Sequence, residues 1–253
     1  MMSWLLLFIA GIGAGIVTGI FGGSATLIVV PLLVIFGGYH PYMAVGLALS
    51  IDVFSSLVAY YVYKIRNRIT LKPALPMILS ALGGVLIGSL FAIRIPENVL
   101  TILAGFGILL ASLKFIFDSS TPIKKIKNWF DGGHSLPVAW GFINGIGLGV
   151  IGGGGGIILL VGLTVLLGYP IHKAIGVSVL GMVALALVGA ISHYALMPFS
   201  LSALAIGIIG GVIGALVSAQ LANKLNEKKL NIIIGLCLLT LGAGLLIKGL
   251  FLI

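Results

Sequence analysis

The sequence predicts an all-α polytopic membrane protein built from two inverted-topology repeats, and three observations lead to this fold class. First, 60% of the residues are hydrophobic and only 8% are charged, whereas charged residues make up about a quarter of a soluble globular domain. Second, a long apolar pattern occurs twice along the chain. Third, the lysines and arginines are distributed differently in corresponding connections of the two copies.

The internal repeat is read directly from two stretches that align without a gap. "GIFGGSATLIVVPLLVIFGGYHPYMAVGLALS" (19–50) aligns on "GVIGGGGGIILLVGLTVLLGYPIHKAIGVSVL" (149–180). The identical positions are Gly19 with Gly149, Gly22 with Gly152, Gly23 with Gly153, Gly38 with Gly168, Tyr39 with Tyr169, Ala44 with Ala174 and Gly46 with Gly176. The sequence therefore predicts a first transmembrane repeat over 1–117, a polar cytoplasmic linker over 118–136 and a second transmembrane repeat over 137–253.

Each repeat contains five apolar segments. They are 3–21, 24–37, 42–64, 72–92 and 97–117, followed by 137–151, 156–168, 173–196, 200–222 and 230–253. Because a spanning helix needs about 20 residues, the second segment of each repeat is too short to cross a membrane. We expect each repeat to hold a Gly-rich broken or re-entrant short helix pair beside three long transmembrane helices. Irregular backbone at membrane depth requires protein or a watery cavity to satisfy its polar groups.

Charge placement predicts that the two repeats are inverted. The connection after the third segment, "YKIRNRITLK", is rich in Lys and Arg, whereas its counterpart, "HYALMPFSLS", has neither. Under the positive-inside rule the first connection is cytoplasmic and the second lies outside. This topology places both termini outside the cytoplasmic membrane. It also explains the net charge of +9 without a nucleic-acid partner, and inverted repeats are an arrangement that many secondary transporters use.

Three sets of motifs stand out along the chain: "GGSATLIVVPLL", the paired segments "MAVGLALS" and "KAIGVSVL", and the paired segments "GGVLIG" and "GGVIGA". With these motifs the chain resembles the TauE/SafE sulfite exporter family over essentially its whole length. The resemblance implies transport of sulfite, thiosulfate, sulfoacetate and related small sulfur-containing or organic anions across a bacterial or archaeal cytoplasmic membrane. The chain departs from the family pattern at Gly22–Ala25, which replaces a fuller glycine run, and at Ala48, where the second repeat keeps Ser178.

The two Gly-rich joints are the predicted substrate site, because a dehydrated anion needs fixed donors and hardly any Lys or Arg lies at mid-membrane depth. Helix N-termini offer backbone N–H groups and a partial positive charge, and glycine lets an anion approach the backbone. The candidate substrate-binding residues are Gly22, Gly23, Ser24, Ala25, Thr26, Gly152, Gly153, Gly154, Gly155, Gly156, Asn144 and Ser178. Glycines spaced by four elsewhere, such as Gly84 with Gly88 and Gly210 with Gly214, are typical of close helix packing.

Asp52 is the proton-coupling candidate, since it is the carboxylate near the centre of a long apolar run. An ionisable group at that depth costs about 3 kcal/mol on insertion scales, and protonation would end its repulsion of a bound anion. The other interpretation is a buried acid satisfied by hydroxyl groups or water. His193 is expected near the membrane interface, at the outer end of its helix.

Three function classes follow from these residues. The leading one is a secondary anion transporter that works by alternating access, with proton coupling through Asp52 as one variant. A passive anion channel would use the same helix dipoles. An intramembrane hydrolase with Ser24 as nucleophile and His193 as base is the third class, and it requires the two side chains to meet. No enzyme activity, cofactor or metal is expected, the partners are the lipid bilayer and a small anion, and formation of a homo-oligomer stays open.

Overall fold

The computed structural model is helical throughout and describes residues 2–66, 70–117, 135–152, 155–221 and 227–251, among which there is no strand. The first repeat forms α1 (Met2–Phe21), α2 (Thr26–Ile35), α3 (Pro41–Arg66), the 3-10 turn η1 (Lys72–Ala74), α4 (Leu75–Ala92) and α5 (Glu97–Phe117). The second forms α6 (Ser135–Ile151), α7 (Gly155–Val165), α8 (Ile171–Leu196), α9 (Leu201–Leu221) and α10 (Glu227–Phe251). The all-α prediction is confirmed, and each of the ten predicted apolar segments holds a helix. The broken or re-entrant helix pair in each repeat stays a prediction. Residues 118–134 of the predicted linker lie outside the described residues.

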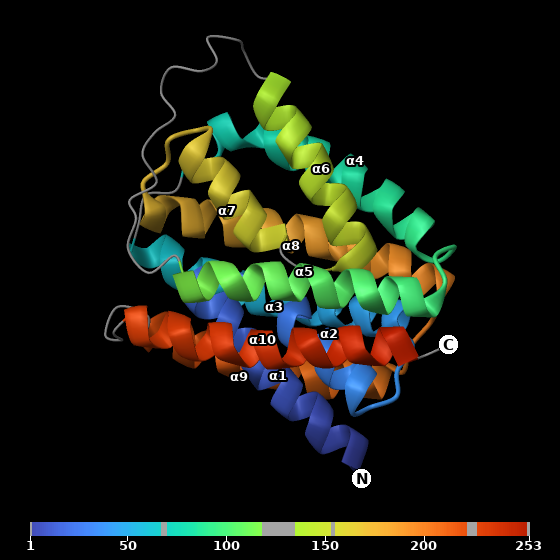
Figure 1. The fold of residues 1–253 in the computed structure, drawn as a ribbon. Helices are drawn as coiled ribbons and strands as arrows, with labels where there is room; N and C mark the ends of the chain where they lie inside the picture. The colour runs from blue at the N-terminus through green and yellow to red at the C-terminus, as the bar shows by residue number, and fades with distance from the viewer. Residues whose placement is uncertain (1, 67–69, 118–134, 153–154, 222–226, 252–253) are drawn as a thin grey trace.

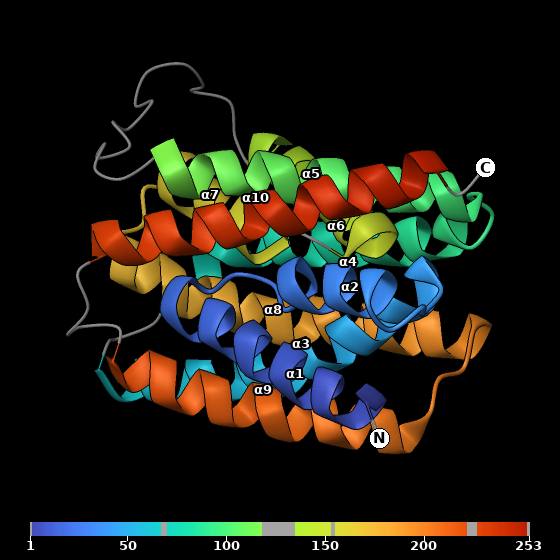
Figure 2. The same ribbon diagram turned by 60° about the horizontal axis from the view of Figure 1, so that its bottom comes forward.

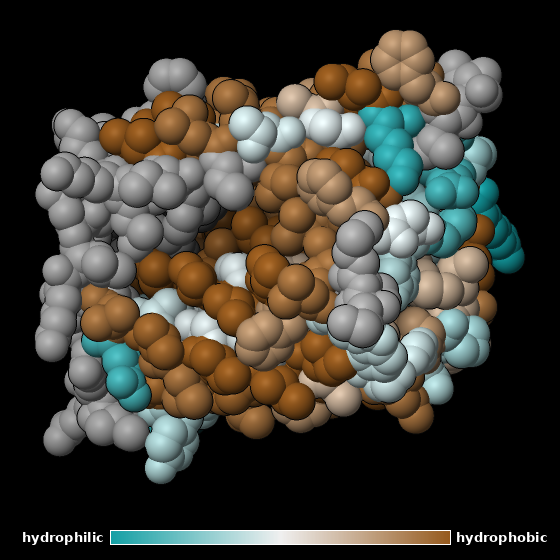
Figure 3. Space-filling model, turned by 90° about the horizontal axis from the view of Figure 1, so that it is seen from below, coloured by the Kyte–Doolittle hydropathy of each residue, from teal (hydrophilic) through white to brown (hydrophobic). Residues whose placement is uncertain are grey.

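The helices have the dimensions of a multi-pass membrane protein. Within the described residues four spans are long and apolar enough to cross a bilayer: Pro41–Lys64, Lys72–Ala92, Lys173–Leu196 and Leu201–Leu221. Figure 3 shows apolar side chains across the middle of one face and hydrophilic side chains gathered toward its ends. As the sequence predicts, α2 and α7 are too short to span, with 10 and 11 residues.

Glycines bring two helix pairs into backbone contact. On α1, Gly11 and Gly15 face Gly207 and Gly211 of α9, and a Cβ on either α1 glycine would overlap a carbonyl oxygen of α9. Residue numbers rise together along this pair, so the two helices run parallel. Close backbone approach between small residues is how membrane helices associate without a hydrophobic driving force between them.

The counterpart pair, α4 with α6, packs in the same way. Gly141 and Gly145 of α6 lie against the backbone of Met77 and Ala81 of α4, and Gly84 lies against the carbonyl of Phe142. Again the numbers rise together and the helices run parallel. The packing role predicted for the spaced glycines is confirmed for both helix pairs, since Gly210 and Gly214 also face the α1 backbone.

Two further helix pairs join a helix to its counterpart in the other repeat. Helix α5 packs along α10 and α3 along α8, and both pairs are antiparallel (Figures 1 and 2). In the first pair Gly105 faces Gly242 while Gly249 faces Asn98. Because α1 and α6 find their main partners in the opposite repeat, the halves 1–117 and 137–253 interleave. The inverted relation between them stays a prediction, and it agrees with these directions.

The same backbone break recurs in both repeats. Gly22 has φ 64° and Gly152 has φ 69°, directly after α1 and α6. These two glycines are matched in the sequence repeat, and the described residues other than glycine all avoid positive φ. An L-residue in this left-handed conformation costs roughly 1 kcal/mol or more, so glycine suits the position.

A pair of adjacent glycines on α4 tests the packing. We expect Gly84→Ala to destabilise the protein by about 1–3 kcal/mol, since the new methyl group would push α6 away from α4. Gly83→Ala is the matched control, because nothing lies within 4 Å of a Cβ there, and it should be neutral or stabilising. Thermal unfolding in detergent, followed by circular dichroism, measures both variants. Equal losses of stability would contradict close packing at Gly84.

Candidate functional site

The two Gly-rich joints lie in direct contact. A Cβ on Gly156 would overlap the carbonyl oxygen of Gly22, and a Cβ on Gly152 would lie 2.7 Å from the Cγ2 of Thr26. The segments that the sequence assigns to one site from opposite repeats are therefore brought together at their glycines. Two of the predicted binding residues, Gly153 and Gly154, lie outside the described residues.

Asp52 faces the joint that precedes α2. Its side chain is fully buried, Ser24 Oγ lies 2.6 Å from Oδ2, and Thr18 Oγ1 donates to Oδ1 at 3.2 Å. The backbone of Ala25 adds a further hydrogen bond to the carboxyl. The Asp52 carboxyl, which belongs to α3, thus accepts hydrogen bonds from the donors at the start of α2, where the sequence predicts a bound anion.

Hydroxyl groups of the first joint reach the backbone of the second. Thr26 Oγ1 donates to the Gly152 carbonyl at 2.5 Å, and Ser24 Oγ lies 3.0 Å from the same oxygen. The two hydroxyl oxygens are 2.7 Å apart. Asp52, Ser24, Thr26 and the Gly152 carbonyl therefore form one continuous hydrogen-bonded chain across the boundary between the repeats.

The second joint is lined differently. Asn144 Nδ2 donates to the Gly155 carbonyl at 3.1 Å, and Ser178 Oγ donates to the Gly156 carbonyl at 2.7 Å. Both predicted donors therefore bind the joint's own backbone. Met182, which the repeat aligns with Asp52, lies beside Gly156, with its Cγ 3.3 Å from where a Cβ of Gly156 would stand. A thioether side chain thus takes the place that a carboxyl has in the first repeat.

His193 lies in the last turn of α8, so its position at the membrane interface stays a prediction. The imidazole is fully buried inside the protein. Its Nε2 lies 2.9 Å from the Gly149 carbonyl and its Nδ1 lies 3.1 Å from the Tyr42 carbonyl. The ring also stacks on Tyr42 with centroids 4.0 Å apart. Packing between α3 and α8 covers the imidazole, which hydropathy along α8 does not reveal.

Tyr63 makes the equivalent contact in the first repeat. Its hydroxyl donates to the Gly19 carbonyl at 2.9 Å, and the repeat aligns Gly19 with Gly149 and Tyr63 with His193. Each long helix therefore holds the last turn before the break of α1 or α6. Sequence reasoning missed this pair. Continuing the repeat alignment past residue 50 would have found it, because the offset is unchanged.

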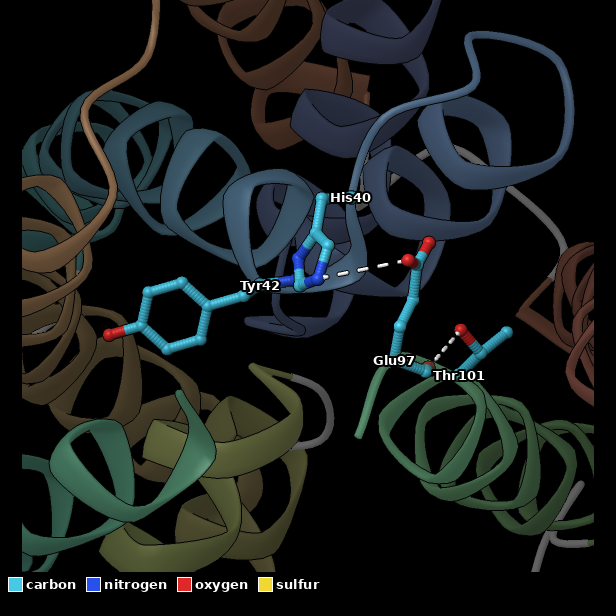
Figure 4. Close-up of polar contacts among 4 residues, drawn as sticks. All are labelled: His40, Tyr42, Glu97 and Thr101. Carbon is cyan, nitrogen blue, oxygen red and sulfur yellow. Dashed lines mark hydrogen bonds and ion pairs between the residues drawn. The ribbon is translucent and has the colours of Figure 1, made fainter. Parts of the chain in front are cut away.

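The connection that leads into α3 is anchored around Tyr42 (Figure 4). The Tyr42 N–H donates to His40 Nδ1 at 3.2 Å, while His40 Nε2 lies 3.9 Å from Glu97 Oε2 at the start of α5. Thr101 Oγ1 donates to the Glu97 carbonyl at 2.7 Å. The pair of His40 and Glu97 is partly exposed, and such a pair contributes at most about 1 kcal/mol to stability. Its role is to position the loop that leads into α3.

A second connection is tied down outside the spans. The Tyr169 hydroxyl, between α7 and α8, donates to the Thr70 carbonyl at 2.7 Å. Desolvation by burial raises the pKa of Tyr169 above its ordinary value, so the phenol stays protonated and remains a donor near neutral pH. This contact joins the connection that follows α3 to the one that precedes α8.

The described contacts do not bring Ser24 and His193 together, as the hydrolase interpretation requires. The contacts of Ser24 are Asp52, Thr26 and Gly152, whereas those of His193 are Tyr42 and Gly149. Among the described residues there is also no group of three His, Cys, Asp or Glu side chains placed to hold a metal ion.

Comparison with known proteins assigns the chain to a transporter family. The family model described as "Sulfite exporter TauE/SafE" matches residues 7–245. "Probable membrane transporter protein YunE" of Bacillus subtilis (strain 168) is 25% identical over 276 aligned positions, which cover 99% of this chain and 100% of the relative. "Probable membrane transporter protein ORF9" of Sinorhizobium sp is 29% identical over 174 positions, which cover 66% of this chain and 63% of the relative.

Proposed function

Because the chain belongs to the sulfite exporter TauE/SafE family, we propose that it is a secondary transporter that carries small sulfur-containing or organic anions by alternating access. That it is a multi-pass membrane transporter rather than an enzyme follows from the family, the relatives and the apolar helices. The observation that carries the finer proposal is the contact between Gly22 and Gly156. It brings two interrupted helices, one from each repeat, to a single place.

The anion is held by the backbone at the start of the short helices. The first turn of a helix has N–H groups without intrahelical acceptors and a partial positive charge from the helix dipole. Gly155 and Gly156 start α7 without a Cβ, and Leu148 and the Gly22 carbonyl pack closely against them. The substrate-binding set then comprises the two joints with Ser24, Thr26, Asn144 and Ser178, in a prokaryotic cytoplasmic membrane with both termini outside.

Proton coupling through Asp52 is supported by the number of protons in its hydrogen-bonded chain. Three contacts link Asp52 to Ser24, Ser24 to Thr26, and Thr26 to the Gly152 carbonyl, at 2.6, 2.7 and 2.5 Å. Each hydroxyl supplies one proton. An ionised carboxylate therefore leaves one of the three contacts without a proton. A protonated carboxyl provides one proton for each contact and completes the hydrogen-bonded chain through Ser24 and Thr26.

Electrostatics gives the sign of the coupling. The recorded contacts of the Asp52 carboxyl are the hydroxyls of Thr18 and Ser24 and the backbone of Ala25, so none is ionisable near neutral pH. Two like charges 4 Å apart repel by about 4 kcal/mol at an effective dielectric constant of about 20. A substrate anion near the joints therefore favours protonated Asp52, and proton and anion travel in the same direction.

Tyr63 and His193 serve as the two gates. His193 lies beside Tyr42 at the start of α3, whereas Tyr63 lies near the end of the same helix. The two gates therefore lie at opposite ends of the molecule. Each one holds the helix that leads into a joint. Breaking the hydrogen bond of one gate at a time opens the site to one side of the membrane only, which is what alternating access requires.

Flux into proteoliposomes tests the substrate site. We expect saturable sulfite uptake by the wild-type protein, at least about tenfold less with Gly156→Ala, and retained uptake with Gly147→Ala. The first substitution drives a methyl group into the Gly22 carbonyl, while nothing lies within 4 Å of a Cβ on Gly147. Thiosulfate and sulfoacetate are measured in parallel. Uptake that never saturates would identify a channel instead.

The pH dependence of the same flux tests the role of Asp52. Uptake by the wild-type protein should rise as the outside is made more acidic, since protonation removes the repulsion between the carboxylate and the anion. Asp52→Asn stays neutral at every pH, so the pH dependence and proton movement that Asp52 supplies should be lost, and only those due to the protonation of sulfite itself should remain. A pH-sensitive dye inside the vesicles reports proton movement. A wild-type pH profile in Asp52→Asn would rule out this coupling group.

Thiol labelling tests the two gates. In a Cys237→Ser, Ser178→Cys background, a membrane-impermeant reagent is applied to either side of the membrane. Tyr63→Phe should raise labelling from one side about fivefold and His193→Phe from the other, because a lost hydrogen bond is worth about 1 kcal/mol. Increased labelling from the same side in both variants would refute opposite gates.

A further inference from the structure

One buried polar atom at the second joint has no partner. The Asn144 side chain is 2% exposed. Among the described residues its Oδ1 has no hydrogen-bond partner, while its Nδ2 donates to the Gly155 carbonyl at 3.1 Å. Reversing the amide would bring oxygen against oxygen, so this orientation is fixed by the contact. A free acceptor therefore stands at the first turn of α7, in a place where polar atoms are normally satisfied.

The first repeat shows what the second one lacks. There the first turn of α2 is faced by the carboxyl of Asp52, whereas Met182 stands at the aligned position beside α7. Asn144 aligns with Ala14, which is buried and carries no polar group. The start of α7 thus combines glycine backbone, an apolar side chain in place of a carboxyl, and an unpaired acceptor.

From these three features we propose that the transported anion binds at the first turn of α7 and donates a hydrogen bond to Asn144 Oδ1. The inference rests on the proposed transport function and narrows its substrate class. The carrier selects anions that bear a donor of their own, which are singly protonated oxyanions and hydroxyl-bearing sulfonates or carboxylates. The anionic end faces the backbone N–H groups of α7, as the carboxyl of Asp52 faces α2.

The physical basis for selection is the cost of an unpaired acceptor. An anion with only acceptor oxygens would leave Oδ1 unsatisfied or bring a second oxygen against it. Sites built to bind a substrate hydroxyl reject the analogue without one far more strongly than apolar pockets separate ligands that differ by a methylene. A donor-bearing anion avoids this penalty and gains a hydrogen bond.

Two monovalent sulfonates of similar size provide a direct test. Hydroxymethanesulfonate carries a hydroxyl group, and ethanesulfonate carries a methyl group in its place. Each is added as an inhibitor of sulfite uptake into proteoliposomes, so that binding is measured whether or not the sulfonate itself crosses. We expect hydroxymethanesulfonate to inhibit the wild-type protein at a concentration about tenfold lower than ethanesulfonate.

Two variants assign the preference to the Asn144 side chain. Asn144→Leu, of similar shape but without the acceptor, should bring the ratio of the two inhibition constants close to one. Ser178→Ala removes the donor to the Gly156 carbonyl at the same turn and should keep the preference. Equal inhibition of the wild-type protein, or an unchanged ratio in Asn144→Leu, would overturn the inference. Absence of any saturable sulfite uptake would instead refute the proposed transport function.

Discussion

The approach of the Gly22 carbonyl to Gly156 is the constraint on which the site depends. A Cβ at that point would separate the two breaks, and with them the hydroxyls of Ser24 and Thr26 from the Gly152 carbonyl. The interrupted helices must then satisfy their polar groups on each other, since the surrounding bilayer offers no hydrogen bonds. Gly156 therefore allows the two helix breaks to pack together and leaves the backbone there without a side chain.

Because the repeats interleave, the contact between Gly22 and Gly156 is coupled to the packing of the other helices. The parallel pairs α1 with α9 and α4 with α6 lock each half onto the other through glycine-to-backbone packing. Helices α1 and α6 lead directly into the joints, so a shift of either pair changes the contact at the centre. The hydrogen bonds of Tyr63 and His193 to the last turns of α1 and α6 act on the same elements.

The two copies of the sequence repeat share a backbone break but carry different side chains beside it. The left-handed glycines recur at matched positions, but Asp52 is matched by Met182, Tyr63 by His193 and Ala14 by Asn144. The first joint consequently holds an ionisable group, while the second holds an unpaired acceptor. Two helix starts of similar geometry thus face different chemistry, which fits separate places for a proton and an anion.

The sequence by itself determined the helical segments, the short α2 and α7, the packing glycines and the two joints, because periodic hydropathy and glycine placement act locally along the chain. It also singled out Asp52 by its position in an apolar run. Only the tertiary structure decided that Asp52 faces the start of α2, that His193 is buried, and that Asn144 keeps a free oxygen. Those outcomes depend on which helices lie side by side. Ser24 and Gly152 are far apart in the chain, and a contact of this kind leaves no local pattern in the sequence.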